Sequence, residues 1–258
     1  VVDWDTIIDV YNHPLGGIGV GNGNYSSGGV YTIDKTPPTV ILSSSATTPN
    51  NFASIPVVAT FNEDIPELFA GQPNFVESDV TLENATLSDF EMTSSGVFNF
   101  NVHPVADGQV SVRLDAGVAK DQAGNGNTAT GSLIFQSDRT APVPVVTGPG
   151  VATRVSPIVF TIDFPEPVTG LTAAGISVIG GTKGALSGSG AGPYTLPVTP
   201  PADGPVTCQV LAGVVRDAAQ NANPASDPVT VSLDRVSPRP TVTGPASPTN
   251  AYPIDFVI

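Results

Sequence analysis

The features that the sequence lacks narrow the class of protein first. One cysteine, Cys208, stands among 258 residues, so no internal disulfide can form and disulfide-stapled scaffolds are excluded. No apolar run approaches the ~20 residues that a membrane-spanning helix needs, and no segment keeps helical spacing for more than two turns. Residues 1–20 have neither the charged start nor the apolar core of a secretion signal, so we expect the signal of an exported protein to lie outside this segment.

Basic residues and histidines are also scarce. Nine Lys and Arg stand against 23 Asp and Glu, which gives a net charge of −14 and a pI near 4.1. So acidic a chain lacks the basic surface that nucleic acid or an anionic membrane requires, whereas it attracts divalent cations. The histidines are His13 and His103, both in the first half, so a Ser-His-Asp site cannot recur along the chain. We therefore expect no enzyme.

Glycine and proline, by contrast, are abundant, with 27 and 26 residues. A disordered chain rich in these residues would lack the 40% hydrophobic content and the mean hydropathy of +0.14 found here. Frequent turn residues between short runs of Val, Thr and Ile are typical of strands joined by turns. The composition predicts an all-β protein.

An internal repeat organises the sequence. Residues 102–127 align with residues 198–223 without a gap at an offset of 96, and thirteen of the 26 aligned positions are identical. The shared positions include Ala-Asp-Gly, Ala-Gly-Val and Asp-x-Ala-x-Asn-x-Asn. Identity at half of the positions without a gap indicates two copies of one module.

The junctions between modules repeat as well. DKTPP at residues 34–38, DRTAP at 138–142 and DRVSP at 234–238 are spaced by 104 and 96 residues. The boundaries predict the end of a preceding module in residues 1–33, full repeats in 34–138 and 139–234, and the opening strands of a following module in 235–258. The first repeat is longer because residues 63–79 carry about seven extra residues, which we interpret as a loop insertion.

Each repeat contains strands with period-two alternation, the pattern of a sheet with one buried face. Cys208 takes the position of Val112, which predicts a small buried hydrophobic side chain and not a reactive thiol. About seven strands in ~100 residues predict an immunoglobulin-like sandwich. The expected inward residues are Ile55, Val57, Ala59, Phe61, Phe98, Phe100 and Val102 in the first repeat and Ile158, Phe160, Ile162, Phe164, Tyr194, Leu196 and Val198 in the second.

The repeated motifs carry a family resemblance. They read DKTPPTV from Asp34, FNE from Phe61, VTLEN from Val80, ADG from Ala106 and DQAGN from Asp121, and the second repeat keeps most of them. This pattern resembles the bacterial Ig-like repeats of large surface adhesins and other extracellular proteins. The resemblance implies tandem sandwich domains in an extracellular stalk or spacer, and the family as such carries no catalytic residues.

Acidic residues form the strongest candidate site. In a seven-strand sandwich the entering chain, the loop after the second strand and the loop before the last strand lie at one end, so we expect three carboxylates to meet at each junction. Carboxylates from several segments suit Ca²⁺, which takes 6–8 oxygen ligands; the alternative is that Asp-x-Ala-x-Asn is only a turn that caps backbone amides. The candidate ligands are Asp34, Glu63 and Asp121 in the first repeat and Asp138, Glu166 and Asp217 in the second.

Prolines at residues 37, 38, 142 and 144 stiffen the junctions, because proline fixes φ and restricts the residue before it. We therefore expect a semi-rigid segment. Together with the family resemblance, this implies a stalk or fibre of an adhesin-type protein at the bacterial cell surface. Its partners would be neighbouring repeats, other copies in a fibre, or a host or surface glycan or protein. Two alternatives stay open: a binding module that uses Phe69 and Phe75 of the insertion 66–76, and spacer repeats of a secreted hydrolase.

Overall fold

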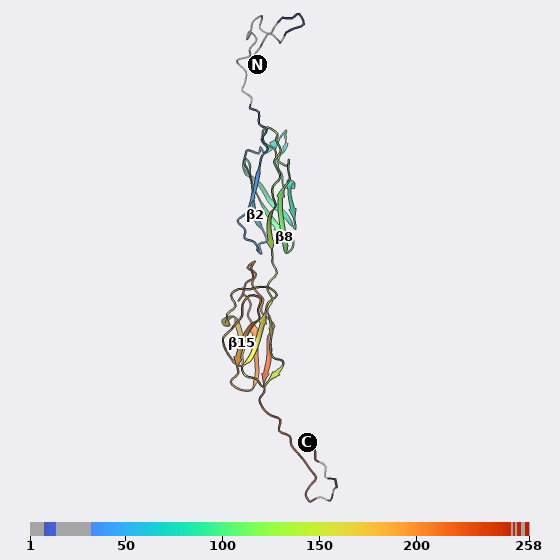
Figure 1. Ribbon diagram of the computed structural model, residues 1–258, viewed down its shortest axis with the longest axis vertical. Coiled ribbons are helices and arrows are strands. Elements are labelled where there is room, and N and C mark those ends of the chain that lie inside the picture. The colour runs from blue at the N-terminus through green and yellow to red at the C-terminus, as the bar shows by residue number, and fades with distance from the viewer. Residues whose placement is uncertain (1–7, 14–31, 249, 251, 254–255, 258) are drawn as a thin grey trace.

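The computed structural model describes residues 8–13, 32–248, 250, 252–253 and 256–257. Strands dominate these residues, and their only helical elements are two 3-10 turns, η1 (Glu77–Asp79) and η2 (Ala173–Gly175). Figure 1 shows two β-sandwiches that follow one another along the long axis of the molecule. The all-β expectation is confirmed. Among the described residues, no helical segment has the length and apolar character of a membrane span.

The first sandwich pairs a four-stranded sheet with a three-stranded one. The four-stranded sheet has the order β1-β2-β7-β6, and the second sheet has the order β5-β8-β9. This is the arrangement of a constant-type immunoglobulin sandwich, with seven strands divided four and three. The strands are β1 (Val40–Ser43), β2 (Ile55–Phe61), β5 (Val80–Glu83), β6 (Ala85–Ser94), β7 (Val97–Pro104), β8 (Gly108–Leu114) and β9 (Leu133–Ser137).

The second sandwich repeats this topology. Its sheets have the orders β10-β12-β15-β14 and β11-β17-β16-β13, and β11 pairs in parallel with the last strand, β17. In the first sandwich a single parallel bridge between Asn50 and Ser137 takes the place of that pairing. The strands are β10 (Val145–Thr147), β11 (Ala152–Thr153), β12 (Ile158–Asp163), β13 (Ile176–Ile179), β14 (Thr182–Lys183), β15 (Tyr194–Thr199), β16 (Gly204–Val210) and β17 (Val229–Leu233).

Each sandwich has its own apolar core between the two sheets. Alternate residues of β2 and β12 are buried, as the period-two pattern predicted, and the same holds for β7 and β15. Phe160, for example, is fully buried, and Cys208 lies in the same core as the alignment with Val112 predicted. Hydrophobic burial of this kind stabilises each module without a disulfide.

The insertion in the first repeat forms a small hairpin of its own. Strands β3 (Leu68–Phe69) and β4 (Gln72–Pro73) pair, and Ala70 and Gly71 turn between them with positive φ. Ile65 and Phe75, on either side of the hairpin, are buried in the core of the first sandwich. The insertion is therefore fastened to the sandwich at both ends.

The two expected terminal modules are described to different extents. Within 235–258 one antiparallel bridge joins Thr243 to Val257. It matches the pairing of Thr147 with Thr161 between β10 and β12 at the repeat offset of 96. The tail expected over residues 1–33 is described only at residues 8–13 and 32–33.

Candidate metal centre

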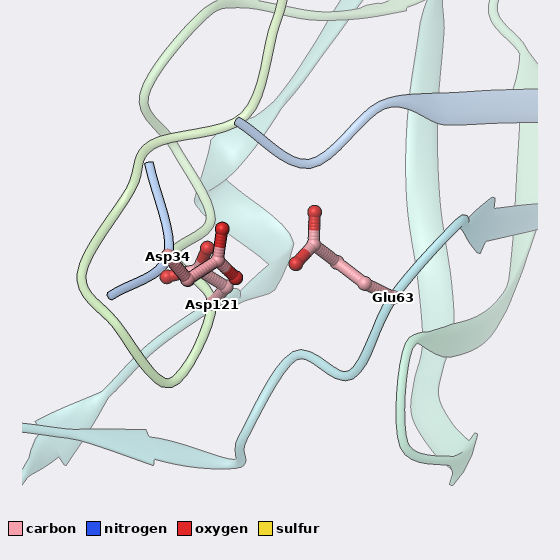
Figure 2. A group of neighbouring side chains, drawn as sticks. All are labelled: Asp34, Glu63 and Asp121. Carbon is pink, nitrogen blue, oxygen red and sulfur yellow. The ribbon is translucent and has the colours of Figure 1, made fainter. Parts of the chain in front are cut away.

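Three carboxylates converge at the end of the first sandwich where the chain enters. Asp34 comes from the linker, Glu63 follows β2, and Asp121 comes from the β8–β9 loop (residues 115–132). One oxygen of each lies within 4.8 Å of the others. Figure 2 shows the Glu63 carboxylate pointing toward Asp34 and Asp121. The structure thus brings together the three residues that the sandwich topology placed at one end.

The second sandwich repeats this arrangement at its own entry. Asp138, Glu166 and Asp217 also offer one oxygen each within 4.8 Å of one another. The cluster lies at the junction between the two sandwiches, because Asp138 follows directly after β9 of the first one. Two clusters of the same composition therefore stand at equivalent places.

The innermost carboxylate of each cluster is held by the asparagine four residues later. Asp121 is 2% exposed, and Asn125 donates its backbone N–H to Oδ1 and its side-chain Nδ2 to Oδ2, both at 2.8 Å. Asn221 does the same for Asp217, at 2.8 and 2.9 Å. The Asp-x-Ala-x-Asn motif thus forms a tight turn that fixes the direction of one buried carboxylate.

The linker carboxylates are also fixed by a local turn. Asp34 accepts the backbone N–H of Thr36 at 2.9 Å, and Asp138 accepts that of Thr140 at 3.1 Å. The backbone carbonyl of Asp34 accepts a hydrogen bond from the side-chain amide of Asn125, and that of Asp138 accepts one from Asn221. The aspartates thus cap backbone amides in local turns, as the alternative interpretation of the motif predicted, and the same turns position the carboxylates of each cluster.

Close carboxylates affect one another's protonation. Burial raises the pKa of Glu63, and the charges of Asp121 and Asp34 raise it further. Glu166 has a raised pKa for the same reasons, first burial and then the charges of Asp138 and Asp217. Burial also opposes the charge of Asp121, but the hydrogen bonds from Asn125, Gly124 and Ala123 outweigh it and lower its pKa. Each cluster thus holds two hydrogen-bonded aspartates beside a glutamate whose ionisation is disfavoured.

A divalent cation would relieve this repulsion. Each cluster offers hard oxygen donors from three segments, which is the donor chemistry of Ca²⁺. Three carboxylates supply part of the 6–8 oxygens that Ca²⁺ takes, and backbone carbonyls and water commonly supply the rest. The residues present therefore fit the ion.

A serine and a histidine also meet elsewhere on the first sandwich, a contact that no motif of the sequence predicted. Ser88 Oγ lies 2.8 Å from His103 Nε2, and it also donates to Asp89 at 2.9 Å. His103 Nδ1, however, lies 2.9 Å from the carbonyl oxygen of Ala53 and not from a carboxylate. The aspartate is on the wrong partner for a Ser-His-Asp triad, in which it orients the histidine.

The Ala-Asp-Gly motif also has a contact that sequence reasoning missed. Asp107 accepts the backbone N–H of Arg139 at 2.9 Å and the hydroxyl of Thr140 at 2.6 Å. Asp203 accepts the backbone N–H of Arg235 at 2.9 Å and its side-chain Nε at 2.7 Å. The signal that could have found this contact was the constant pairing of Ala-Asp-Gly with a following Asp-Arg junction.

A hydrogen bond between two side chains joins the first sandwich to the second. Asn51 Nδ2 donates to Asn221 Oδ1 at 3.1 Å. Because Asn221 also donates to Asp217 and to the carbonyl of Asp138, this amide connects both sandwiches and the linker between them. The second cluster is therefore part of the junction itself.

Two tandem immunoglobulin-like sandwiches without disulfides define the class of protein. A family model described as "Bacterial Ig-like domain" matches residues 34–136 and again residues 138–233. The chain therefore belongs to the bacterial Ig-like domain family, as the repeated motifs indicated. No curated protein matches the sequence significantly.

Similar solved structures include bacterial adhesins. The Escherichia coli adhesin FdeC is 12% identical over 81% of this chain and 67% of its own, with a TM-score of 0.36. The Yersinia pseudotuberculosis adhesin InvE is 12% identical over 76% of this chain and 58% of its own, with a TM-score of 0.30. Yersinia pseudotuberculosis InvD is 13% identical over 83% of this chain and 64% of its own, with a TM-score of 0.33. The chain thus spans about two thirds or less of the length of these three structures. With identities and TM-scores this low, these structures add nothing to what the family match shows.

Proposed function

We propose that this chain is a spacer segment of a bacterial surface protein of the adhesin type, in which the tandem domains set distance and direction. The observation that carries this proposal is the end-to-end arrangement of two similar sandwiches around a short, hydrogen-bonded junction (Figure 1). Membership of the bacterial Ig-like family supports it. The proposal includes no catalytic activity, since the carboxylates of the two clusters lie in linkers and turns.

In this proposal Ca²⁺ stiffens the junctions. An ion at the second cluster would join Asp138 of the linker to Glu166 and Asp217 of the following sandwich. Extracellular modules bind Ca²⁺ with a Kd of about 10⁻⁴–10⁻³ M, and at ten times the Kd the bound ion adds ~1.4 kcal/mol of stability. That energy would oppose bending of one sandwich relative to the next.

Small-angle scattering tests the spacer proposal on residues 1–258. In millimolar Ca²⁺ we expect an extended particle at least as long as two sandwiches in line, with a smaller mean dimension in EDTA. A magnesium-only sample controls for ionic strength. A folded-back particle in Ca²⁺ would refute the spacer role, whereas equal profiles in Ca²⁺ and EDTA would refute only the stiffening.

A binding role for the insertion is the second candidate, because one observation favours it. The hairpin and the edge strand β6 enclose an apolar recess whose lining includes Leu68, Phe75, Phe90 and Met92. Leu68 is 57% exposed, while Phe75 belongs to the core. A glycan array that compares the whole chain with a variant lacking residues 66–74 tests this candidate, and equal signals would reject it.

A further inference from the structure

We propose that the Ala-Asp-Gly loop is an anchoring site for the linker that follows it, so that each linker moves as part of the preceding repeat. The loop lies between β7 and β8 in the first sandwich and between β15 and β16 in the second. In both, its aspartate binds the residue directly after the junction aspartate. The partner of this site is a short extended segment with free backbone N–H groups and a basic side chain.

The contacts of the first linker show where it is fastened. The backbone N–H of Asp138 donates to the carbonyl of Asn50 at 2.9 Å. The next residue, Arg139, donates its N–H to Asp107 and a guanidinium N–H to the carbonyl of Val105 at 3.2 Å. All three acceptors belong to the first repeat, so residues 138–140 are held by the domain that precedes them.

The second linker is fastened in the same way. Asp234 donates its backbone N–H to the carbonyl of Thr153 at 2.9 Å, and Arg235 binds Asp203 through both its N–H and its side chain. Hydrogen bonds to a charged acceptor are stronger than neutral ones. Two independent copies with the same partners indicate that the anchor is a designed feature of the repeat and not an accident of one loop.

This anchor places the pivot of the junction. Residues 138–140 belong to the first repeat, whereas Pro142 is buried and only two residues remain before β10. Proline restricts the backbone of Ala141 before it. Any bending between the sandwiches therefore falls on Ala141, whose backbone freedom Pro142 already reduces, and it requires the loss of the hydrogen bonds that Asn221 makes to Asn51 and Asp138.

The anchor also has a consequence for the acidic cluster, which rests on the proposed function. Asp138 is presented to Glu166 and Asp217 by a linker that the other sandwich holds in place. Asp107 is then a positioning residue for a cation site that lies in the next repeat. Fixing a residue in advance reduces the conformational entropy that binding must overcome.

Amide hydrogen exchange of the full chain in EDTA tests the anchor without any cation. In Asp107→Ala we expect the N–H of Arg139 to exchange at least about tenfold faster, because its charged acceptor is lost, while the N–H of Arg235 is unchanged. Asp203→Ala should give the reverse pattern. Amides of β2 and β7 report whether the sandwich stays folded, and Asp107→Asn, which keeps an acceptor oxygen, should restore part of the protection.

Unchanged exchange at Arg139 in Asp107→Ala, with Arg235 also unchanged in Asp203→Ala, would overturn the anchor. Calcium calorimetry then tests its consequence: Asp107→Ala should weaken one of two sites by about tenfold, while Asp203→Ala should weaken neither. If the wild-type chain binds no Ca²⁺, the stiffening proposal fails and the exchange result still decides the anchor. Equal calcium affinities in the wild type and Asp107→Ala would refute the positioning role alone.

Discussion

Replacing Glu166 by glutamine should stabilise the second sandwich in EDTA and weaken its response to Ca²⁺. The carboxylate of Glu166 lies within 4.8 Å of both Asp138 and Asp217. At this distance two charges repel by ~0.9 kcal/mol in water, so the two pairs together cost roughly 2 kcal/mol. Salt at 0.1 M reduces this to about 1 kcal/mol. The sequence change removes that repulsion without changing the shape of the side chain.

The stability gain is measurable by calorimetry. For a domain of this size 1 kcal/mol shifts Tm by about 4–8 °C, so the second sandwich of Glu166→Gln should melt that much higher in EDTA. Saturating Ca²⁺ should raise the wild type by a similar amount and the variant by less, because it has lost a charged ligand. The Tm values of the wild type and Glu166→Gln should therefore converge, or change order, when Ca²⁺ is added.

The matched variant Glu63→Gln should act in the same way on the first sandwich and leave the second unchanged. Glu91→Gln, at an exposed position on β6 outside both clusters, controls for loss of net charge. A lower Tm for Glu166→Gln in EDTA would show that the three carboxylates do not repel as their distances require. Equal Ca²⁺ shifts in the wild type and Glu166→Gln would refute the assignment of Glu166 as a ligand.

Three more outcomes are expected. The pKa of Glu63 and of Glu166 is raised in the folded state, so the folded state binds these protons more tightly, and the contribution of the two groups to folding stability falls as pH rises above about 4.3. Urea unfolding at pH 5 and pH 7 in EDTA, compared with the double glutamine variant, checks the sign of this pH dependence, and Ca²⁺ should reverse it. Burial raises the pKa of Cys208 to about 11, so a thiol reagent at pH 8 should react only after unfolding, while Cys208→Val should preserve stability within about 1.5 kcal/mol. Asn223 is buried and binds two backbone N–H groups and two carbonyls, so Asn223→Ala should cost at least about 1–3 kcal/mol in chemical denaturation; a smaller loss would refute its role in holding the loop.

Much of the fold could be predicted from the sequence because two independent features, the alternation of apolar residues and the internal repeat, indicate the same strands. Alternation identifies the buried face of a strand such as β2, and the alignment of the two repeats carries that assignment to β12. The sandwich topology then brings the linker, the residue after β2 and the β8–β9 loop to one end. The convergence of Asp34, Glu63 and Asp121 follows from this topology alone.

The remaining features depend on loop geometry, which alternation does not encode. Ser88 reaches His103 beside an irregularity in β6, where Asp89 has a φ of 54° and the register shifts between Ser88 and Glu91. The Asp107 anchor depends on a loop that places one carboxylate next to a linker 32 residues later. The inward direction of Ile65 and Phe75 depends on where the inserted hairpin folds back.

The parallel contact between the first and last segments of each sandwich bears on how the chain resists tension. Asn50 is hydrogen-bonded to both Gln136 and Asp138 in the first sandwich. In the second, the backbone N–H groups of Ser232 and Asp234 donate to the carbonyls of Val151 and Thr153. In Figure 1 the chain enters each sandwich at one end and leaves at the opposite end. A pull on the two ends therefore acts along these strands in shear and loads their hydrogen bonds together, not one after another as in peeling. Such a patch would make the rate of forced unfolding, rather than the equilibrium stability, the quantity that decides how long each sandwich stays folded under load.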